Sequence, residues 1–168
     1  PPPPPPFFFF NLIRSYAILS GLVGSEMCIR DRCGYGFPSI LGAKIGCPDT
    51  PVIGFAGDGA FGMSGMDFET ATRQKIGITT LVLNNGVMAT YPVGGPSDFP
   101  TAREKSGVGT MTGNYADFAR SFGAHGIQVS KISELAPALE TAKGLNSTGK
   151  TVIIDVKTTP VSKRGYKA

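Results

Sequence analysis

From Gly34 onward, short apolar runs alternate with segments whose apolar residues recur at helical spacing. Gly, Pro, Asn or Ser bound the apolar runs, which predict strands over residues 51–56, 79–83, 127–129 and 152–156. Because helical segments separate these strands, we predict an α/β fold: a doubly wound, mostly parallel sheet with helices on both faces. Such a sheet binds ligands beyond the carboxyl ends of its strands.

Capping residues and proline indicate where the helices begin. Pro38 is well placed to open a first helix that runs to Ile45. Three further helices are expected to start at side chains that can cap a helix, namely Ser64, Asn114 and Ser133. Their predicted inner faces are Met66, Phe68 and Ala71, then Phe118 and Phe122, then Leu135, Leu139 and Ala142.

Residues 1–32 differ from the rest of the chain. They begin with six prolines and four phenylalanines, a low-complexity run without helical or strand periodicity. Asn11, Arg14 and Ser15 interrupt the apolar stretch, which argues against a membrane span, and no basic region precedes it as in a signal peptide. The stretch 24–32 resembles a translated sequencing adapter. We therefore expect a non-native or disordered segment at 1–32 and one domain at 33–168.

The composition is that of a globular protein, with 168 residues of which 41% are hydrophobic and 17% charged. The 16 Lys and Arg outnumber the 12 Asp and Glu only slightly and are spread along the chain. We therefore expect neither nucleic acid nor a membrane as a partner. Cys28, Cys33 and Cys47 form no CxxC pair, so we expect neither disulfides nor a zinc or iron–sulfur site, and we expect a cytoplasmic protein.

Candidate chemistry lies at the ends of the first two predicted strands. The turn 57–59 (Gly-Asp-Gly) follows the first strand, and 84–85 (Asn-Asn) follows the second, so parallel pairing would bring them to one edge. Residues 57–62 also fit the GxGxxG fingerprint of dinucleotide-binding turns. However, Asp58 places a carboxylate where a diphosphate would lie, and asparagines replace the acid that binds a dinucleotide ribose.

A divalent cation would remove the repulsion between Asp58 and a diphosphate. Mg²⁺ prefers oxygen ligands, which the Asp58 carboxylate, the Asn85 amide and the Val87 carbonyl could supply. The free N–H groups of Gly59 and Ala60 could then hold phosphate. The alternative is an ordinary turn followed by an ordinary strand end, but the two dipeptides together, in this order, favour the site.

These residues resemble the diphosphate-binding domain of thiamine diphosphate-dependent enzymes. That family carries GDG, some two dozen residues and then NN, and here the 24 residues 60–83 separate Gly59 from Asn84. The segments 33–44 and 57–64 are similar to the branch of acetolactate synthases and 2-oxo acid decarboxylases. The resemblance covers residues 33–168.

The resemblance implies thiamine diphosphate and Mg²⁺ as cofactors, with Asp58, Asn85 and Val87 as the metal ligands. It further implies a cofactor site lined by Cys33, Gly57, Gly59, Ala60 and Met88 together with these ligands. Cys33 would lie under the bent cofactor, where the family usually has a larger apolar residue. No residue of this chain is expected to act as the main catalytic base.

The family's catalytic glutamate comes from a pyrimidine-binding domain of a neighbouring subunit, and 168 residues leave no room for that domain. We do not expect a substitute among Glu69, Glu104, Glu134 and Glu140. The resemblance therefore implies a piece of a larger homo-oligomeric enzyme that acts on 2-oxo acids. The alternatives are the small subunit of a split 2-oxo acid decarboxylase, a non-catalytic Mg²⁺-diphosphate module and, last, a dinucleotide oxidoreductase.

Two further features of the sequence are a long connection and a single histidine. Residues 86–113 are rich in Gly and Pro and longer than a usual connection, which indicates either a lid or disorder. We favour a lid over the cofactor, with Met88 and Tyr91 facing the pocket. His125 is the only histidine and precedes a short strand, so we expect it to have a structural or surface role.

Overall fold

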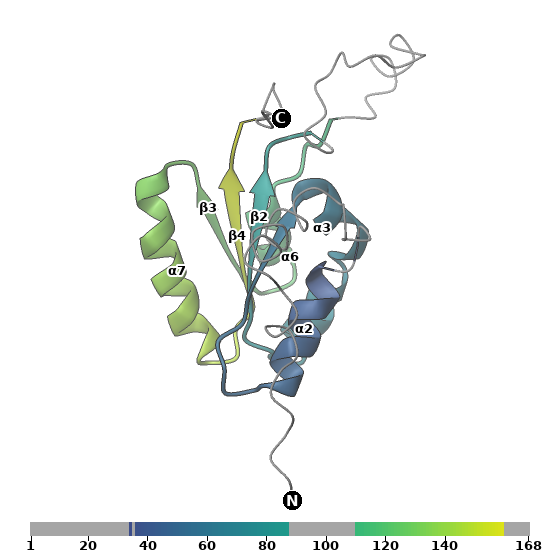
Figure 1. The fold of residues 1–168 in the computed structure, drawn as a ribbon, viewed down its shortest axis with the longest axis vertical. Coiled ribbons are helices and arrows are strands. Elements are labelled where there is room, and N and C mark those ends of the chain that lie inside the picture. Colours follow the sequence, from purple (N-terminus) through teal and green to yellow (C-terminus); the bar gives the residue numbers. More distant parts are fainter. Residues whose placement is uncertain (1–33, 35, 88–109, 160–168) are drawn as a thin grey trace, which may run out of the picture.

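The structure, a computed structural model, describes residues 34, 36–87 and 110–159 (Figure 1). Helices and strands alternate along these ranges, as the apolar pattern predicts. The elements are α2 (Gly36–Gly46), β1 (Ile53–Gly57), α3 (Asp58–Ser64), α4 (Asp67–Arg73), β2 (Thr79–Asn84), α6 (Tyr115–Ser121), β3 (His125–Val129), α7 (Ile132–Asn146) and β4 (Val152–Lys157). Each predicted strand is present, with ends that differ from the prediction by at most two residues.

The strands form one parallel sheet in the order β1-β2-β4-β3. Gly57 at the end of β1 is in register with Leu83 of β2, and Asn84 at the end of β2 is in register with Lys157 of β4. The carboxyl ends of these strands therefore lie along one edge of the sheet. With helices on both faces of this sheet, the predicted doubly wound α/β fold is confirmed.

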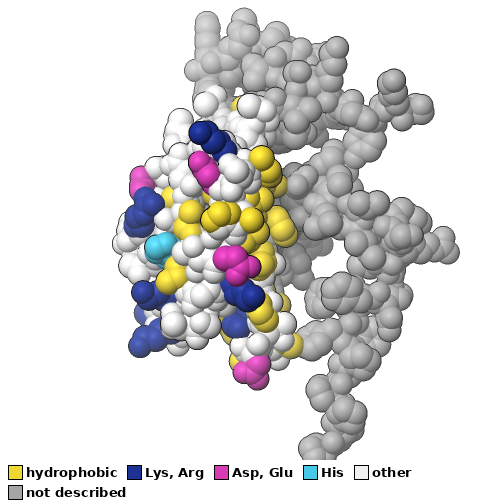
Figure 2. Space-filling view, turned by 90° about the vertical axis from the view of Figure 1, so that its left-hand side faces the viewer, with side chains coloured by type: hydrophobic (Ala, Val, Ile, Leu, Met, Phe, Trp, Pro, Cys, Tyr) yellow, Lys and Arg dark blue, Asp and Glu magenta, His cyan; other side chains and the backbone are white. Residues whose placement is uncertain are grey.

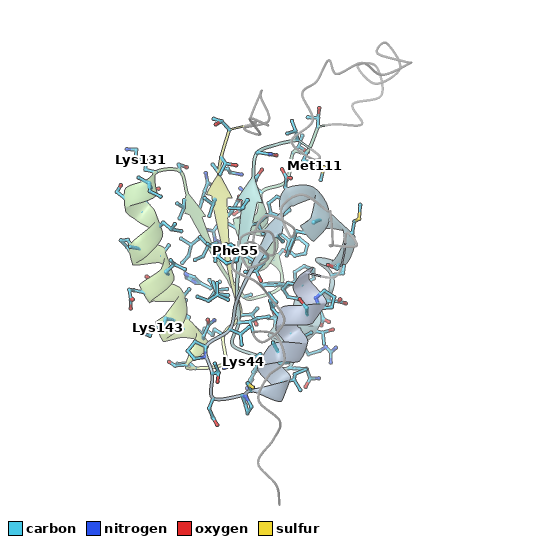
Figure 3. All side chains as sticks on the ribbon, viewed as in Figure 1. Lys44, Phe55, Met111, Lys131 and Lys143 are labelled. Atoms are coloured by element: carbon cyan, nitrogen blue, oxygen red, sulfur yellow. The ribbon has the colours of Figure 1, made fainter. Side chains whose placement is uncertain are left out.

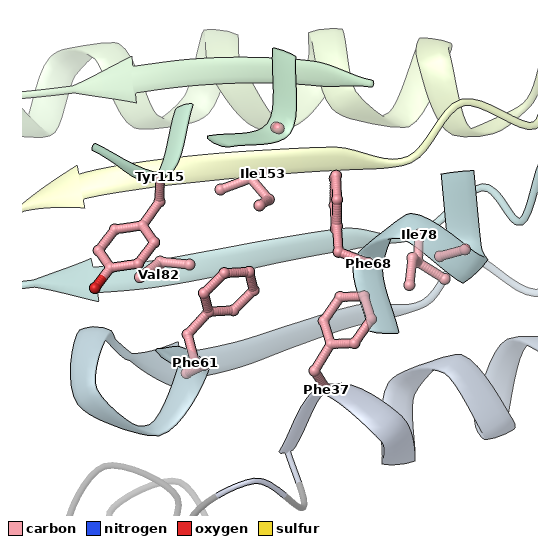
Figure 4. Close-up of a cluster of buried hydrophobic side chains, with 10 residues drawn as sticks. Phe37, Phe61, Phe68, Ile78, Val82, Tyr115 and Ile153 are labelled. Carbon is pink, nitrogen blue, oxygen red and sulfur yellow. The ribbon is translucent and has the colours of Figure 1, made fainter. Parts of the chain in front are cut away.

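Aromatic rings fill the face of the sheet against which α2, α3, α4 and α6 pack (Figure 4). Phe61 meets Tyr115 and Phe118 edge to face, with ring centroids 5.4 and 5.6 Å away. Phe37 and Phe68 extend the cluster. Edge-to-face contacts add to the free energy gained by burying the rings. Because Phe61 belongs to α3, this aromatic cluster holds the helix that begins at the end of β1.

Helix α7 packs on the opposite face through small residues. Ala138 and Ala142 are buried in a cluster with apolar side chains such as Ile154. On β1, at the edge of the described sheet, Ile53 and Phe55 are 48% and 42% exposed and alternate with the buried positions of the aromatic side. Figure 2 views the molecule from the α7 side and shows apolar side chains gathered on this surface.

Two predicted helix starts have different outcomes. Asn114 caps α6 as predicted, because its Oδ1 accepts a hydrogen bond from the N–H of Asp117 at 3.1 Å. Ser64 is not a cap, and this prediction is wrong. The chain enters α3 directly at Asp58, so Ser64 is the last residue of that helix, and α4 begins only at Asp67.

Helix α7 begins at Ile132, one residue before the predicted Ser133. The reason is that Glu134 reaches back: its Oε2 accepts hydrogen bonds from the N–H groups of Ser130 and Lys131, at 2.8 and 3.1 Å. These bonds lower the pKa of the Glu134 carboxyl. Glu134 therefore acts as the glutamate of a capping box, and Ser133 lies inside the first turn of the helix.

Candidate functional site

The Gly-Asp-Gly turn and the Asn-Asn turn meet at the carboxyl edge of the sheet. Gly57 is the last residue of β1, and Asp58 is the first residue of α3. Gly86, two residues beyond the end of β2, donates its N–H to Oδ2 of Asp58 at 2.9 Å. The predicted proximity of the two turns is therefore confirmed, and one hydrogen bond joins them.

Asp58 is buried, with 3% of its surface exposed. Its Oδ1 accepts the N–H of Gly59 at 2.8 Å, and its Oδ2 accepts that of Gly86. Burial raises the pKa of the Asp58 carboxyl, and these backbone hydrogen bonds oppose the shift. In the described part of the chain, no Lys, Arg or His forms an ion pair with Asp58. A buried carboxylate without a cation is costly, so this position suits a metal ion.

The Asn-Asn turn also contains an amide oxygen that a cation could use. Oδ1 of Asn85 accepts the N–H of Val87 at 3.0 Å, which closes a tight turn. Gly86 inside this turn has a φ of 72°, a conformation that favours glycine. An amide oxygen has two lone pairs, so Oδ1 of Asn85 keeps one for a cation. The role of Asn85 and Val87 as metal ligands stays a prediction.

The backbone of Gly57, Gly59 and Ala60 lies at the same edge. A Cβ atom on Gly57 would meet no atom within 4 Å, so there is open space beside the turn. The expectation that the N–H of Gly59 is free is wrong here, because that group donates to Oδ1 of Asp58. Ala60 is the third residue of α3, and the first N–H groups of a helix have no partner within it. Ala60 is thus the better placed donor for a phosphate.

The donor set fits Mg²⁺ better than a transition metal. Within residues 34, 36–87 and 110–159, no group of three or more His, Cys, Asp and Glu could hold a metal ion. The predicted ligands are the Asp58 carboxylate, the Asn85 amide oxygen and the Val87 carbonyl, which are hard oxygen ligands of the kind that Mg²⁺ accepts. The oxygens of a diphosphate ligand would complete the coordination of such an ion.

Two buried polar residues that the sequence analysis missed lie beside the site. Asp155 of β4 is fully buried, and its carboxylate accepts hydrogen bonds from Asn84 Nδ2 and from the N–H of Tyr115, both at 3.0 Å. The hydroxyl of Tyr115 donates to the main-chain oxygen of Asp58 at 3.1 Å. Burial, with the charges of Asp58 and Asp155, raises the pKa of Tyr115 to about 12. The sequence does contain one signal for Asp155, because it is the single acid inside the apolar run 152–156.

Several predicted site residues lie outside the described residues. They are Cys33, Met88, Tyr91 and Glu104, together with residues 88–109 of the predicted lid. The described ends of that segment are joined to each other, because Met111 donates its N–H to the carbonyl of Gly86 at 2.9 Å.

The described glutamates and the histidine lie on other elements. Glu69 pairs with Arg73 on the surface of α4, and Glu134 and Glu140 belong to α7. His125 is the exposed first residue of β3, which agrees with the expected surface role. None of these side chains has a hydrogen bond to Asp58 or Asn85 within the described ranges.

A cleft of about 770 Å³ lies at the other end of the sheet. Ile53 and Thr79, the first residues of β1 and β2, contribute to its lining together with Lys44 and Lys143 (Figure 3). No predicted site residue within the described ranges lines this cleft. Separately, no helix of the described ranges has the length and apolar character needed to cross a membrane.

Comparison with known proteins identifies relatives. The family described as thiamine pyrophosphate enzyme, C-terminal TPP binding domain, matches residues 26–156. A sulfoacetaldehyde acetyltransferase of Alcaligenes xylosoxydans xylosoxydans is 39% identical over 132 residues, which are 76% of this chain and 21% of that protein. A probable acetolactate synthase of Mycobacterium bovis is 33% identical over 135 residues, which are 79% and 23% of the two chains. The chain therefore spans about a fifth of the length of these relatives.

A solved structure has a similar fold. It is the thiamine diphosphate-dependent 4-hydroxybenzoylformate decarboxylase of Rhodococcus jostii RHA1, with a TM-score of 0.60 over 77% of this chain and 24% of that one. The two sequences are 22% identical, so this likeness concerns the fold alone.

Proposed function

Because the chain belongs to the family of thiamine pyrophosphate enzymes, as a C-terminal TPP-binding domain, we propose that it binds the diphosphate of thiamine diphosphate through Mg²⁺. The observation that carries the proposal is the buried Asp58 carboxylate, which has no cationic partner in the described ranges and faces the Asn-Asn turn. Asp58, Asn85 and the Val87 carbonyl would hold the metal ion. Gly57 leaves space for the diphosphate, and Ala60 offers it a donor.

The proposed reaction class is decarboxylation or carboligation of 2-oxo acids. When bound, thiamine diphosphate supplies the electron sink that such reactions need. The name of the acetolactate synthase relative supports this class, whereas the name of the acetyltransferase relative gives an aldehyde as the substrate and an acetyl transfer as the reaction. The described residues of this chain would bind and orient the cofactor, and we assign none of them a proton transfer.

We further propose that the chain works as part of a larger cytoplasmic homo-oligomer. The larger protein is supported by the fact that the chain spans about a fifth of its relatives, while the homo-oligomer and the cytoplasm are carried over from the sequence analysis. A pyrimidine-binding domain, on the same chain or another, would supply the catalytic glutamate that the family requires.

Titration calorimetry with thiamine diphosphate, with and without Mg²⁺, tests the binding proposal. We expect the wild-type chain to bind only when Mg²⁺ is present. Asp58→Ala should weaken this binding by at least about 100-fold, because loss of a metal ligand costs at least as much as loss of a group that orients one. Circular dichroism checks that the variant is folded.

Asp49→Ala is the matched control, because Asp49 is an exposed acid at the opposite end of the sheet, on the lining of the cleft. It should bind like the wild type. Unchanged Mg²⁺-dependent affinity in a folded Asp58→Ala chain would contradict the metal assignment.

A further inference from the structure

We infer that Asp155 is a positioning residue that holds the two turns of the candidate metal site in place without touching the ligand. This inference deepens the proposed function and rests on it. Asp155 lies at the centre of the hydrogen bonds that connect β4, β2 and the start of α6.

The burial of Asp155 requires an explanation. The side chain is 0% exposed, in a strand whose other buried positions are apolar. A buried carboxylate is stable only when hydrogen bonds and charge satisfy it. Here Oδ1 accepts from Asn84, and Oδ2 accepts from the N–H of Tyr115 and pairs with Lys157 Nζ at 3.0 Å. The Asp155 carboxylate is thus a strong acceptor that fixes the positions of these three partner groups.

One route from Asp155 to the site passes through Asn84. The Asn84 side-chain amide donates to Asp155 and also to the carbonyl of Gly113, at 3.0 Å in each case. Asn84 therefore turns inward at the end of β2, and the chain leaves that strand in a defined direction. Two residues later, Gly86 donates its N–H to the Asp58 carboxylate.

A second route passes through Tyr115. Asp155 accepts the N–H of Tyr115, the first residue of α6. The ring of Tyr115 packs against Phe61, and its hydroxyl donates to the main-chain oxygen of Asp58. Both routes end at Asp58, one at its carboxylate and one at its backbone. Loss of the Asp155 carboxylate should therefore loosen the predicted metal ligand from two sides.

The other end of the sheet offers a comparison. Thr79 is equally buried, and its hydroxyl donates to Oδ1 of Asn146 at 2.6 Å, while Asn146 also donates to the carbonyl of Ile78. This polar cluster lies at the start of β2 and shares no described hydrogen bond with Asp58 or Gly86. Its loss should lower stability without a specific effect on the site.

The test compares Asp155→Asn with Thr79→Val in the 168-residue chain. Both substitutions nearly keep the shape of the side chain and disturb one buried polar cluster. Amide hydrogen exchange by NMR, without ligand, reports the Gly86 hydrogen bond, and the core amide of Val82 serves as the reference for overall stability. We expect Asp155→Asn to speed exchange at Gly86 by at least about tenfold relative to Val82. Thr79→Val should leave this ratio unchanged.

Binding is measured separately, with Mn²⁺ as a spectroscopic probe. The electron paramagnetic resonance signal of free Mn²⁺, recorded with thiamine diphosphate present, gives the apparent affinity. Asp155→Asn should weaken it by about 10- to 100-fold, the usual effect of removing a group that orients metal ligands. Thr79→Val should bind Mn²⁺ like the wild type.

Asn84→Ala tests the first route and replaces Asp155→Asn if that variant does not fold. It leaves the contacts of Asp155 with Tyr115 and Lys157 in place. It should also speed exchange at Gly86, and adding it to Asp155→Asn should have less than the additive effect.

The outcomes separate the two proposals. If exchange at Gly86 is the same in Asp155→Asn as in Thr79→Val, the proposed role of Asp155 is overturned. If Asp155→Asn does not fold, the same comparison is made with Asn84→Ala in its place. A wild-type chain that takes up no Mn²⁺ with thiamine diphosphate would overturn the proposed function instead. The exchange comparison uses no ligand, so it decides the role of Asp155 in either case.

Discussion

Tyr115 combines a buried hydroxyl with two neighbouring carboxylates. Burial, followed by the charges of Asp58 and Asp155, raises its pKa from 10.0 to about 12. For an acid whose pKa is raised by folding, the stabilising contribution is complete below the pKa of the unfolded chain. It is lost as the pH rises from that value toward the pKa of the folded chain.

The wild-type chain should therefore lose stability between pH 10.0 and about 12. Tyr115→Phe has no hydroxyl to ionise, so its free energy of unfolding should depend less on pH in this window. Urea denaturation of both proteins on either side of pH 10.0 measures the difference. Equal pH dependence would mean that the Tyr115 hydroxyl is not protected in the fold.

Thr80 is a second residue whose buried hydroxyl affects the free energy of unfolding. Its Oγ1 is buried and has no hydrogen-bond partner among the described residues. Thr80→Val replaces the hydroxyl by a methyl group of similar shape and should raise the free energy of unfolding by about 1 kcal/mol. Urea denaturation measures the change.

Thr151→Val is the matched control for Thr80→Val. Thr151 is equally buried, but its hydroxyl donates to the carbonyl of Ile76 at 2.8 Å. Its substitution should lower the free energy of unfolding by about 1 kcal/mol. A loss of stability in both variants would show that Thr80 has a partner.

The site residues that could be predicted are those with local signals. Asp58 and Asn85 follow strands and carry recognisable turn sequences, so their meeting at one edge follows from parallel pairing alone. The single acid in the run 152–156 marks Asp155 as unusual, but it does not reveal the partner, because Asn84 is 71 residues away in the sequence. Contacts of this kind depend on the strand order, and the alternation of strands and helices does not determine where β4 is inserted.

At the scale of elements, β3 and α6 approach so closely that only glycine fits between them. Gly126 of β3 is buried, and a Cβ atom there would collide with the backbone of Ala116 in α6. Gly126→Ala should therefore lower the free energy of unfolding by about 3 kcal/mol. Thermal and urea denaturation measure this loss.

Gly144 provides the contrast within a helix. It is exposed on α7, and a Cβ atom there would meet nothing within 4 Å. Gly144→Ala should raise the free energy of unfolding by up to about 1 kcal/mol, because alanine favours the helix. A Gly126→Ala variant as stable as Gly144→Ala would contradict the close approach of β3 and α6.

The elements themselves were more predictable than their ends. Apolar runs identified the four strands of the described sheet, although only the central strands β2 and β4 are buried on both faces. Helix starts were less certain, because a capping residue can be available and unused. Ser64 is such a case, since the aromatic cluster holds α3 from Asp58 onward.

At the scale of the whole molecule, no glutamate of the described ranges has a hydrogen bond to Asp58 or Asn85. Glu69 and Glu134 make their hydrogen bonds on the surfaces of other elements. We therefore expect the chain alone to release no carbon dioxide from pyruvate, even with thiamine diphosphate and Mg²⁺. Release should begin when a pyrimidine-binding domain is added. Decarboxylation by the chain alone would contradict the need for that domain.

The position of β1 links the site to the edge of the described sheet. This strand ends next to Asp58 and pairs, within the described sheet, with β2 alone. Edge strands open more readily than central ones, and each separation of β1 from β2 would break the link between Asp58 and Gly86. The fraction of molecules that could bind the cofactor would then depend on whether β1 and β2 are paired. Any partner that pairs with β1 on the side away from β2 would increase that fraction and tighten the proposed cofactor binding from a distance.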